Sequence, residues 1–405
     1  MNILFISNEY PPETGSGGIG TYTKHSAEGL CRLGHTVHVI CRSPSATPVT
    51  TIIHGVIIHR IGPGTYPLPG HRIFYPFRSW CYRRIPHSLQ RIAWAREAYA
   101  TYMHVLRPSI RFDIIEYPEC GNEGYFFSKL RDIPRIVRLH TPWETVRKLD
   151  YIKESVFDRI ILSYCERSTV KRSTAVTCPS QSLALEIENR WNVKTAKVFP
   201  NPLPVSDFNS ADGHDWIYTG RIEFRKGVHV LIQAYAQVAQ SLKPPYLYII
   251  GKPYGRHLDG SDYGDYIRRL IAQQYCRDRI TWIPGLPYSE IPNRLRQCAV
   301  AVFPSLWENL PYSCMEALAS GLTVVASATG GFTELIDDGV NGLLFEPGNV
   351  EQLTLQLLKL SAQPLLQREL GAQARLRALR SFDSGVVCKL QESFYRTIKE
   401  GAEGC

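Results

Sequence analysis

The sequence predicts an α/β protein made of two doubly wound parallel sheets, one following the other along the chain. First, its apolar runs are short, continuous and rich in Val, Ile, Phe and Tyr, which is typical of strands buried on both faces of a parallel sheet. Second, helical segments alternate with these runs, as in βαβ units. Third, 405 residues exceed the roughly 250 to 300 at which a single core stops growing. We therefore expect two domains.

The first domain is predicted to span residues 1–204. Its strands are expected at residues 3–7, 37–40, 56–59, 113–117, 135–140, 175–178 and 196–200. Helices are expected between several of them, at residues 18–33, 151–171 and 180–190. The run Pro200-Asn201-Pro202-Leu203-Pro204 is rich in turn-forming residues and is the predicted linker.

The alternation restarts in a second domain, predicted at residues 205–381. Its strands are expected at residues 216–220, 246–251, 280–283, 300–303, 323–327 and 342–345. A helix follows the first of these, because Val228, Leu231, Ile232, Tyr235 and Val238 recur at helical spacing. Ligands of open parallel sheets bind beyond the carboxyl ends of the strands, so two such domains predict a cleft where they face each other.

A last helix is expected at residues 382–400. Its apolar side chains Val387, Leu390, Phe394 and Ile398 lie on one face at helical spacing. No predicted strand follows it to complete another unit of the second domain. We therefore expect this helix to pack back on the first domain.

Composition predicts a cytoplasmic protein. The first seven residues lack a basic lead, and no apolar stretch reaches the roughly 18 to 20 residues that cross a bilayer. The eleven cysteines are scattered and form no C-x-x-C pair, as expected for buried thiols in a reducing compartment. A net charge of +9 suits an anionic substrate, a nucleic acid or a membrane surface equally well.

The most informative stretch is residues 303–321, which holds the glutamates Glu308 and Glu316. A strand is expected to end at Phe303 and a helix to begin at Pro311, because proline favours the first helical position. Free amides at such a helix start bind phosphate, and the candidates are Asn309, Leu310, Tyr312 and Ser313. A carboxylate accepts two hydroxyl donors, so the two acids could hold two diols of one ligand. Taken alone, they are also explained as a loop acid and a helix-surface acid.

A second candidate site is the predicted strand-to-helix turn at residues 218–228. Arg221 can bind a phosphate through two parallel hydrogen bonds, and Lys226 can act as a point charge beside it. Cations fixed in this way stabilise the negative charge that develops when a phosphate leaves. Arg225, between them, is interpreted as an ordinary surface base.

A third candidate is the glycine-rich run at residues 8–20, after the first strand. Glycines let the backbone approach a ligand closely, and the next helix offers its N-terminus. Such a loop also occurs in dinucleotide-binding folds. The spacing of Gly15, Gly17, Gly18 and Gly20, however, is not the G-x-G-x-x-G fingerprint.

Together these segments resemble family 4 of the retaining glycosyltransferases, which have the GT-B fold of two facing Rossmann-like domains. The resemblance covers nearly the whole chain and rests on the glycine-rich loop, the Gly-Arg…Lys-Gly segment, the E-x7-E acid pair and the Gly-Gly-x-x-Glu element at residues 330–334. It implies that Glu308 binds the hydroxyls of a donor sugar and Glu316 the ribose of its nucleotide. Arg221 and Lys226 would then bind the donor diphosphate.

The resemblance also assigns further residues. His140 would lie beside the donor sugar, Gly17 and Gly18 in the loop that closes over donor phosphate or acceptor, and Gly285 with Leu286 against the nucleobase. Many members have glycine where this chain has Pro311, so the amide contact must come from Leu310, Tyr312 or Ser313. Asn201 matches an interdomain asparagine and is given no catalytic role. The element Gly330, Gly331 and Glu334 either lies near the sugar phosphate or serves packing.

Family membership would imply transfer from a nucleotide-diphosphate sugar with retention of the anomeric configuration and without a protein nucleophile. No metal would be required, since the two cations replace it and the sequence has no convincing D-x-D element. The first domain would be the acceptor side and the second the donor side. The acceptor, a glycan, a lipid-linked molecule or a small molecule, is not identified.

Residues 60–107 carry eight arginines, many aromatic residues and one acid, Glu97. The loop-like part, residues 66–86, could rest on an anionic membrane or bind an anionic acceptor, or its arginines could simply be solvated. Two rival functions remain: a nucleotide-sugar epimerase of the same architecture and a non-catalytic nucleotide or sugar sensor. Nucleic-acid binding is not expected, because the basic residues do not form a known reading motif. The oligomeric state is not predicted.

Overall fold

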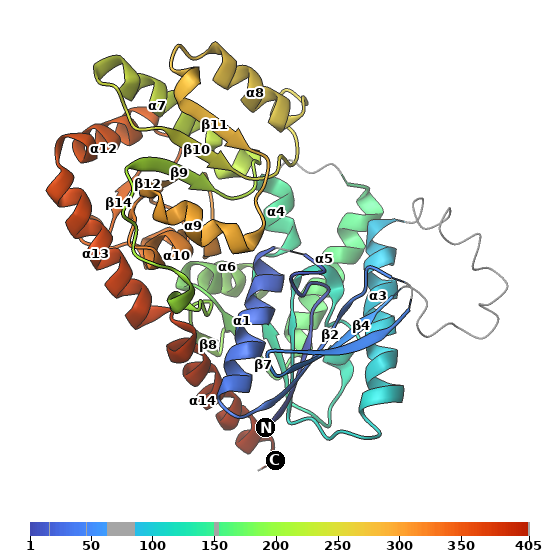
Figure 1. The fold of residues 1–405 in the computed structure, drawn as a ribbon. Helices are drawn as coiled ribbons and strands as arrows, with labels where there is room; N and C mark the ends of the chain where they lie inside the picture. Colours follow the sequence, from blue (N-terminus) through green and yellow to red (C-terminus); the bar gives the residue numbers. More distant parts are fainter. Residues whose placement is uncertain (16, 46, 63–85, 150–153, 404–405) are drawn as a thin grey trace.

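The computed structural model describes residues 1–403 apart from 16, 46, 63–85 and 150–153. The described residues form two α/β domains, each built around a sheet whose strands are parallel or nearly all parallel (Figure 1). The predicted fold class is confirmed. The Arg-rich loop expected at residues 66–86 lies almost wholly outside the described residues.

The first sheet is ordered β3-β4-β2-β1-β5-β6-β7-β8, and all neighbours are parallel except β3 with β4. Its strands are β1 (Asn2–Ile6), β2 (Thr36–Arg42), β3 (Val49–Ile53), β4 (Val56–Ile61), β5 (Ile114–Pro118), β6 (Arg135–Arg138), β7 (Ala175–Cys178) and β8 (Lys197–Val198). Its helices are α1 (Gly18–Arg32), α3 (His87–Thr101), α4 (Trp143–Leu149), α5 (Val156–Arg172) and α6 (Gln181–Trp191), with the short turns η2 (Tyr102–Leu106), η3 (Cys120–Asn122) and η4 (Phe127–Lys129).

Two details of this domain differ from the prediction. Strand β3 was not expected; it pairs with β4 through a two-residue turn whose residues, His54 and Gly55, both have positive φ. The turn has histidine where Asn or Asp usually precedes glycine, so it lacks the usual hairpin signal. The helix predicted at residues 151–171 begins only at Val156, where Ser155 caps it by accepting from the amide of Asp158.

The second sheet is ordered β11-β10-β9-β12-β13-β14 and is parallel throughout its described length. Its strands are β9 (Asp215–Thr219), β10 (Leu247–Ile250), β11 (Ile280–Ile283), β12 (Cys298–Phe303), β13 (Thr323–Ser327) and β14 (Leu343–Phe345). Its helices are α7 (Val228–Ser241), α8 (Tyr263–Gln273), α9 (Ile291–Arg296), α10 (Tyr312–Ala319), α11 (Phe332–Leu335), α12 (Val350–Ala362) and α13 (Pro364–Ser381). Short turns are η5 (Val205–Asp207), η6 (Phe224–Lys226), η7 (Arg277–Arg279) and η8 (Tyr288–Glu290).

The last helix, α14 (Ser384–Glu403), packs against α1 of the first domain (Figure 1). A Cβ atom at Gly29 of α1 would lie 2.2 Å from Sγ of Cys388, so this contact requires a glycine. The Tyr22 hydroxyl donates to the buried Glu116 carboxylate at 2.7 Å, and the Tyr395 hydroxyl of α14 donates to its other oxygen. The chain thus crosses back to the first domain after completing the second.

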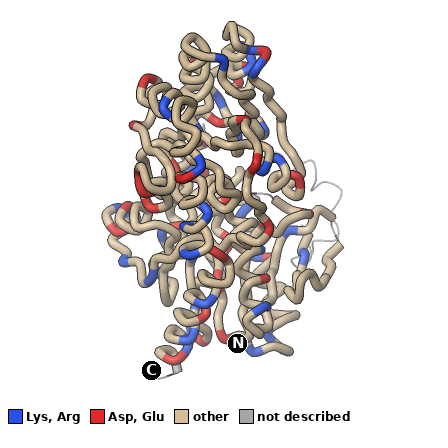
Figure 2. The backbone as a smooth tube through the Cα atoms, turned by 60° about the vertical axis from the view of Figure 1, so that its left-hand side comes forward, with Lys and Arg blue, Asp and Glu red and all other residues tan. Residues whose placement is uncertain are grey.

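Charged residues are spread over both domains (Figure 2). Basic and acidic positions are interspersed along the backbone of both (Figure 2).

The nine cysteines in the described ranges are all free thiols, and seven of them are buried. Among the helices that the structure describes, none has the length and apolar character required to span a membrane. Arg60, counted above with the basic segment, is instead buried and paired with Glu13.

Candidate active site

The basic turn is formed at the carboxyl end of β9. Gly220 leaves the strand with φ of +148°, the turn η6 follows, and Gly227 with φ of +66° leads into α7. A Cβ atom at Gly227 would lie 1.9 Å from the carbonyl oxygen of Pro304. The glycine therefore allows the turn to lie directly against the loop that follows β12.

The acid loop runs from Pro304 to Pro311 and leads into α10. The helix begins at Tyr312 and not at Pro311, which has extended backbone angles and caps the helix without a side-chain hydrogen bond. The amides of Tyr312 and Ser313 lie in the first turn, where a helix offers no internal acceptor. Their contact with an anion remains a prediction.

The Gly-Gly-x-x-Glu element packs against the other side of the acid loop. A Cβ at Gly330 would lie 1.8 Å from the carbonyl oxygen of Glu308, and one at Gly331 would lie 1.5 Å from that of Asn309. The amide of Gly331 also donates to the Glu308 carbonyl at 3.2 Å. Of the two roles considered for these glycines, packing is the one that the structure displays.

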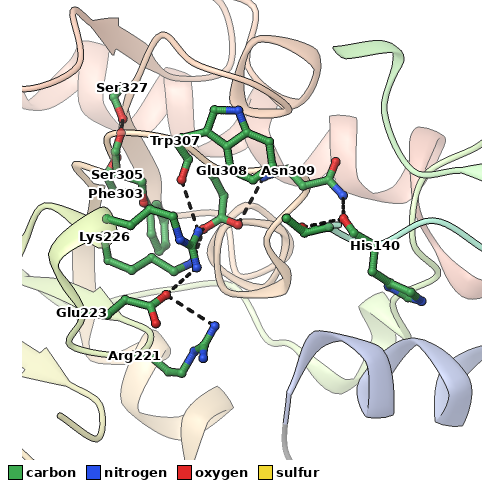
Figure 3. Close-up of polar contacts among 12 residues, drawn as sticks. His140, Arg221, Glu223, Lys226, Phe303, Ser305, Trp307, Glu308, Asn309 and Ser327 are labelled. Atoms are coloured by element: carbon green, nitrogen blue, oxygen red, sulfur yellow. Dashed lines mark hydrogen bonds and ion pairs between the residues drawn. The ribbon is translucent and has the colours of Figure 1, made fainter. Parts of the chain in front are cut away.

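Five charged side chains meet between the turn and the loop (Figure 3). Lys226 contacts Oε2 of Glu308, and Nη1 of Arg225 lies 3.3 Å from the same oxygen. The other side of the Arg225 guanidinium contacts Oε1 of Glu223, which lies 3.4 Å from Nη2 of Arg221. The cluster has three cations and two carboxylates, and so one excess positive charge.

These contacts correct one prediction and add one residue. Arg225 was expected to be an ordinary surface base, but its side chain is only 6% exposed. Glu223, which the sequence analysis did not select, is fully buried. Arg221 is the accessible member of the cluster, with 54% of its side chain exposed and its guanidinium 5.3 Å from the ring centre of Tyr254.

Glu308 is held in its ionised form. Burial alone would raise its pKa, but the adjacent charges of Lys226 and Arg225 outweigh burial and lower the pKa to about 2. Its second oxygen, Oε1, accepts from the amide of Asn309 at 3.2 Å. The carboxylate is therefore fixed and charged, as required of a group that orders hydroxyl groups of a ligand.

Glu316 has a different environment. It lies inside α10, is 5% exposed, and its hydrogen-bond partner is the hydroxyl of Tyr288. Burial raises its pKa to about 7, since no cation offsets the cost of desolvating the charge. The two acids of the E-x7-E pair are thus both buried, which rules out a solvent-exposed loop acid and a helix-surface acid.

The acid loop is joined to the first domain through Asn309. Its side-chain amide donates to the backbone carbonyl of His140, just beyond β6 (Figure 3). Its side-chain oxygen accepts from Ser180 at 2.7 Å. Glu334 makes a second link, because its carboxylate accepts from the amides of Gln181 and Ser182 at the start of α6. None of these interdomain links was evident in the sequence.

His140 is anchored from its own domain as well. Its amide donates to both carboxylate oxygens of the buried Glu119 at 2.9 Å, and its ring contacts that of Tyr22 edge-on at 5.2 Å. Burial, with a smaller effect of the Arg138 charge, lowers the pKa of His140 to about 3. Its imidazole is therefore neutral over the physiological range.

The remaining predicted residues lie apart from the charged cluster. Gly17 caps the N-terminus of α1, Gly18 is its first residue, and a Cβ at Gly17 would lie 2.9 Å from a carboxylate oxygen of Glu9. Gly285 has φ of +146° and, with Leu286, follows β11 beside the side chain of Lys252. Within the described residues, none of these four forms a hydrogen bond or ion pair with the cluster. Their contacts with a donor remain predictions.

Comparison with known proteins identifies the two halves of the chain. The family model "Glycosyltransferase Family 4" matches residues 16–207, and "Glycosyl transferases group 1" matches residues 208–377. A glycogen synthase of Mycobacterium tuberculosis is 23% identical over 99% of this chain and 96% of its own length.

Solved structures show the same fold. A sucrose-phosphate synthase from Thermosynechococcus elongatus superimposes with a TM-score of 0.78 at 19% identity, covering 99% of both chains. Anabaena HepE in complex with UDP-glucose superimposes with a TM-score of 0.69 at 17% identity, covering 100% of both chains. Both likenesses extend over the two domains.

Proposed function

The chain belongs to family 4 of the glycosyltransferases and is a glycosyltransferase with the GT-B fold, and from that premise we propose that it transfers a sugar from a nucleotide-diphosphate donor to a hydroxyl acceptor with retention of the anomeric configuration. The single observation that carries the proposal is the contact between Lys226 and Glu308 beside the accessible Arg221. Cations for a diphosphate and a carboxylate for sugar hydroxyls thus lie in one cluster. Transfer is preferred to epimerisation and to non-catalytic sensing.

The charges of the cluster suit such a donor. Arg221, Lys226 and the first-turn amides of Tyr312 and Ser313 would face the two negative charges of the diphosphate. Glu308 would accept from hydroxyls of the sugar and Glu316 from those of the ribose. HepE is similar to this chain and binds UDP-glucose, which supports a nucleotide sugar as the donor class.

The proposed reaction breaks the bond between the anomeric carbon and the β-phosphate oxygen, and the bonding electrons leave with the phosphate. Arg221 and Lys226 stabilise the charge that develops there. The acceptor oxygen attacks from the same face, and its proton passes to the departing phosphate. Neutral His140 contributes a hydrogen bond or packing beside the sugar, since a neutral imidazole does not act as a general acid at physiological pH.

We further propose that no metal ion is needed, because Arg221 and Lys226 would supply positive charge where negative charge develops. Turnover in excess EDTA equal to turnover in its absence would agree with this. Loss of activity in EDTA that Mg²⁺ or Mn²⁺ restores would oppose it.

The acceptor lies on the side of the first domain in this proposal, and an anionic membrane surface is a proposed partner. Helix α5 supports it, because Val156, Ile160 and Tyr164 recur every fourth residue and are 61%, 60% and 58% exposed. The acids of α5, Asp158 and Glu166, are both buried, while Arg159, Arg167 and Lys171 are exposed. An apolar stripe with basic neighbours is typical of helices that lie on anionic lipid.

Thermal-shift measurements with a panel of nucleotides and nucleotide sugars test the proposed donor class. A ligand at a hundred times its dissociation constant stabilises the folded state by about 2.7 kcal/mol. We expect one nucleoside diphosphate and its sugar conjugates to raise the melting temperature, and the Lys226→Ala variant to lose the response. A panel without any response in the wild type would refute the proposal.

A further inference from the structure

Arg225 lies between the two carboxylates of the charged cluster and is closed to solvent. Nη2 contacts Glu223, whereas Nη1 lies 3.3 Å from Glu308 and 3.2 Å from the backbone carbonyl of Trp307. Its own carbonyl accepts from the amide of Leu306 at 2.7 Å. Arg225 is therefore tied at both ends to the acid loop, and it is the buried guanidinium of the cluster while Arg221 is the exposed one.

Donor binding would affect the two cations that contact Glu308 differently. Both reach the same oxygen, Oε2. Under the proposed function Lys226 must also serve the diphosphate, so its attraction for Glu308 is shared with a competing anion. The diphosphate would also repel the Glu308 carboxylate and favour its protonation. A second cation that cannot reach the phosphate is then required to keep the carboxylate charged.

We propose that Arg225 is a positioning residue that holds the Glu308 carboxylate ionised and aligned with the donor sugar after Lys226 has engaged the diphosphate, and that Glu223 is its anchor. The inference rests on the proposed function and goes beyond the roles given there to Arg221, Lys226 and Glu308. Arg225 has no contact with the substrate in this scheme. It acts only through Glu308.

The planar fork of arginine explains why this position is not served by lysine. One guanidinium reaches Glu223 with one nitrogen and both Glu308 and the Trp307 carbonyl with another. An ammonium group is a single point charge and cannot span both carboxylates from the same backbone position. Arg225→Lys should therefore restore charge without restoring alignment.

The test compares binding of a nucleoside diphosphate with binding of its sugar conjugate, using the full chain. Isothermal titration with UDP, ADP and GDP and with their glucose conjugates is carried out for the wild type, Arg225→Met and Arg225→Lys. We expect Arg225→Met to bind the free diphosphate within about threefold of the wild type, because Arg225 does not touch it. Affinity for the sugar conjugate should fall at least tenfold, the scale of a lost charge-assisted contact.

The pH profile supplies a readout that a merely structural role would not move. Glu308 loses one of its two cations in Arg225→Met, so the acid limb of donor hydrolysis should move to higher pH by about one unit or more. Arg225→Lys should return the limb toward its original position and recover only part of the sugar affinity. Arg268→Met is the matched control, since Arg268 pairs with Asp265 on the surface of α8.

Three outcomes would overturn the inference while the wild type still binds nucleotide. They are an unchanged sugar affinity and pH profile in Arg225→Met, an equal loss of affinity for the free diphosphate, and full recovery of both properties by Arg225→Lys. If Arg225→Met does not fold, the Arg225→Lys variant alone tests the inference. Wild-type sugar affinity and pH profile in Arg225→Lys would show that the guanidinium fork is not needed. Absence of nucleotide binding to the wild type would instead refute the proposed function.

Discussion

The side-chain amide of Asn309 donates a hydrogen bond to the backbone carbonyl of His140, and this contact joins the acid loop of the second domain to the end of β6 in the first. The backbone amide of Asn309 donates to the Glu308 carboxylate. The position of the Glu308 carboxylate is therefore coupled to the way in which the two domains meet. Under the proposed function, transfer from a donor on one domain to an acceptor on the other would depend on how the two domains meet.

The first prediction follows from this contact. Asn309→Ala should fold but lower turnover about tenfold or more. The substitution removes the Asn309 donor from the partly buried His140 carbonyl, a loss that costs about 1 to 3 kcal/mol. Ser180→Ala removes the 2.7 Å bond to Asn309 but keeps the contact with His140, so its loss should be smaller. Steady-state rates with saturating donor measure both. Wild-type turnover in Asn309→Ala would show that the link does not matter for catalysis.

The second prediction concerns the cation at the diphosphate. Lys226→Ala should reduce turnover on the order of a hundredfold, the effect of removing one preorganised group from the developing charge. Lys359, an exposed residue of α12, is the matched control, and Lys359→Ala should behave as the wild type. Equal rates for Lys226→Ala and Lys359→Ala would remove Lys226 from the mechanism.

The third prediction concerns stereochemistry. The sugar in the product should keep the anomeric configuration that it has in the donor, because departure and attack take place on one face. The coupling between the first two ring protons, read by NMR before the product equilibrates, distinguishes the two outcomes. An inverted product would require attack from the opposite face and a different arrangement of the acceptor.

The fourth prediction tests the proposed contact of α5 with anionic lipid. The wild type should sediment with vesicles that contain phosphatidylserine and not with vesicles of phosphatidylcholine alone, and Ile160→Asp with Tyr164→Asp should weaken binding. High salt should weaken it too, since exposed charges are screened. Leu365→Asp is the control, because Leu365 is 74% exposed on α13 of the other domain. No sedimentation with phosphatidylserine vesicles would end this proposal.

The fold could be predicted, and the candidate site residues could be selected, because both follow from local signals. Buried strands read as short apolar runs, and the segments around Arg221, Lys226, Glu308 and Glu316 have recognisable spacing. The packing role of Gly331 could not be deduced in this way, since it depends on a carbonyl 1.5 Å from where its Cβ would be.

Glu223 and Arg225 illustrate the harder case. In sequence they are two charged residues near a helix start, which usually means a solvated surface. They are buried because η6 turns them toward the acid loop, which begins almost eighty residues later at Pro304. Pairing across that separation is decided by tertiary structure, and no periodicity of the sequence carries it. The same is true of Ser180 and Asn309, which meet across the two domains.

The final prediction uses the pKa of Glu316, which burial raises to about 7. A carboxylate accepts two hydroxyl donors better when ionised, so affinity for a nucleoside diphosphate should rise by up to about tenfold between pH 6 and pH 8 as Glu316 loses its proton. The folding stability of the unliganded protein should instead fall over the same pH range. An acid whose pKa is raised on folding contributes stability that is complete below its unfolded pKa and is lost as pH rises through its folded pKa.

Comparison of the wild type with Glu316→Gln separates this effect from the titration of the phosphates, because the ligand titrates identically with both proteins. The variant should bind more weakly at pH 8, and the part of the pH dependence that belongs to Glu316 should vanish from both the titration and the melting curves. Glu351→Gln, on the surface of α12, should leave both unchanged. If Glu316→Gln bound nucleotide with the wild-type pH dependence, the ribose would have to be held by another residue.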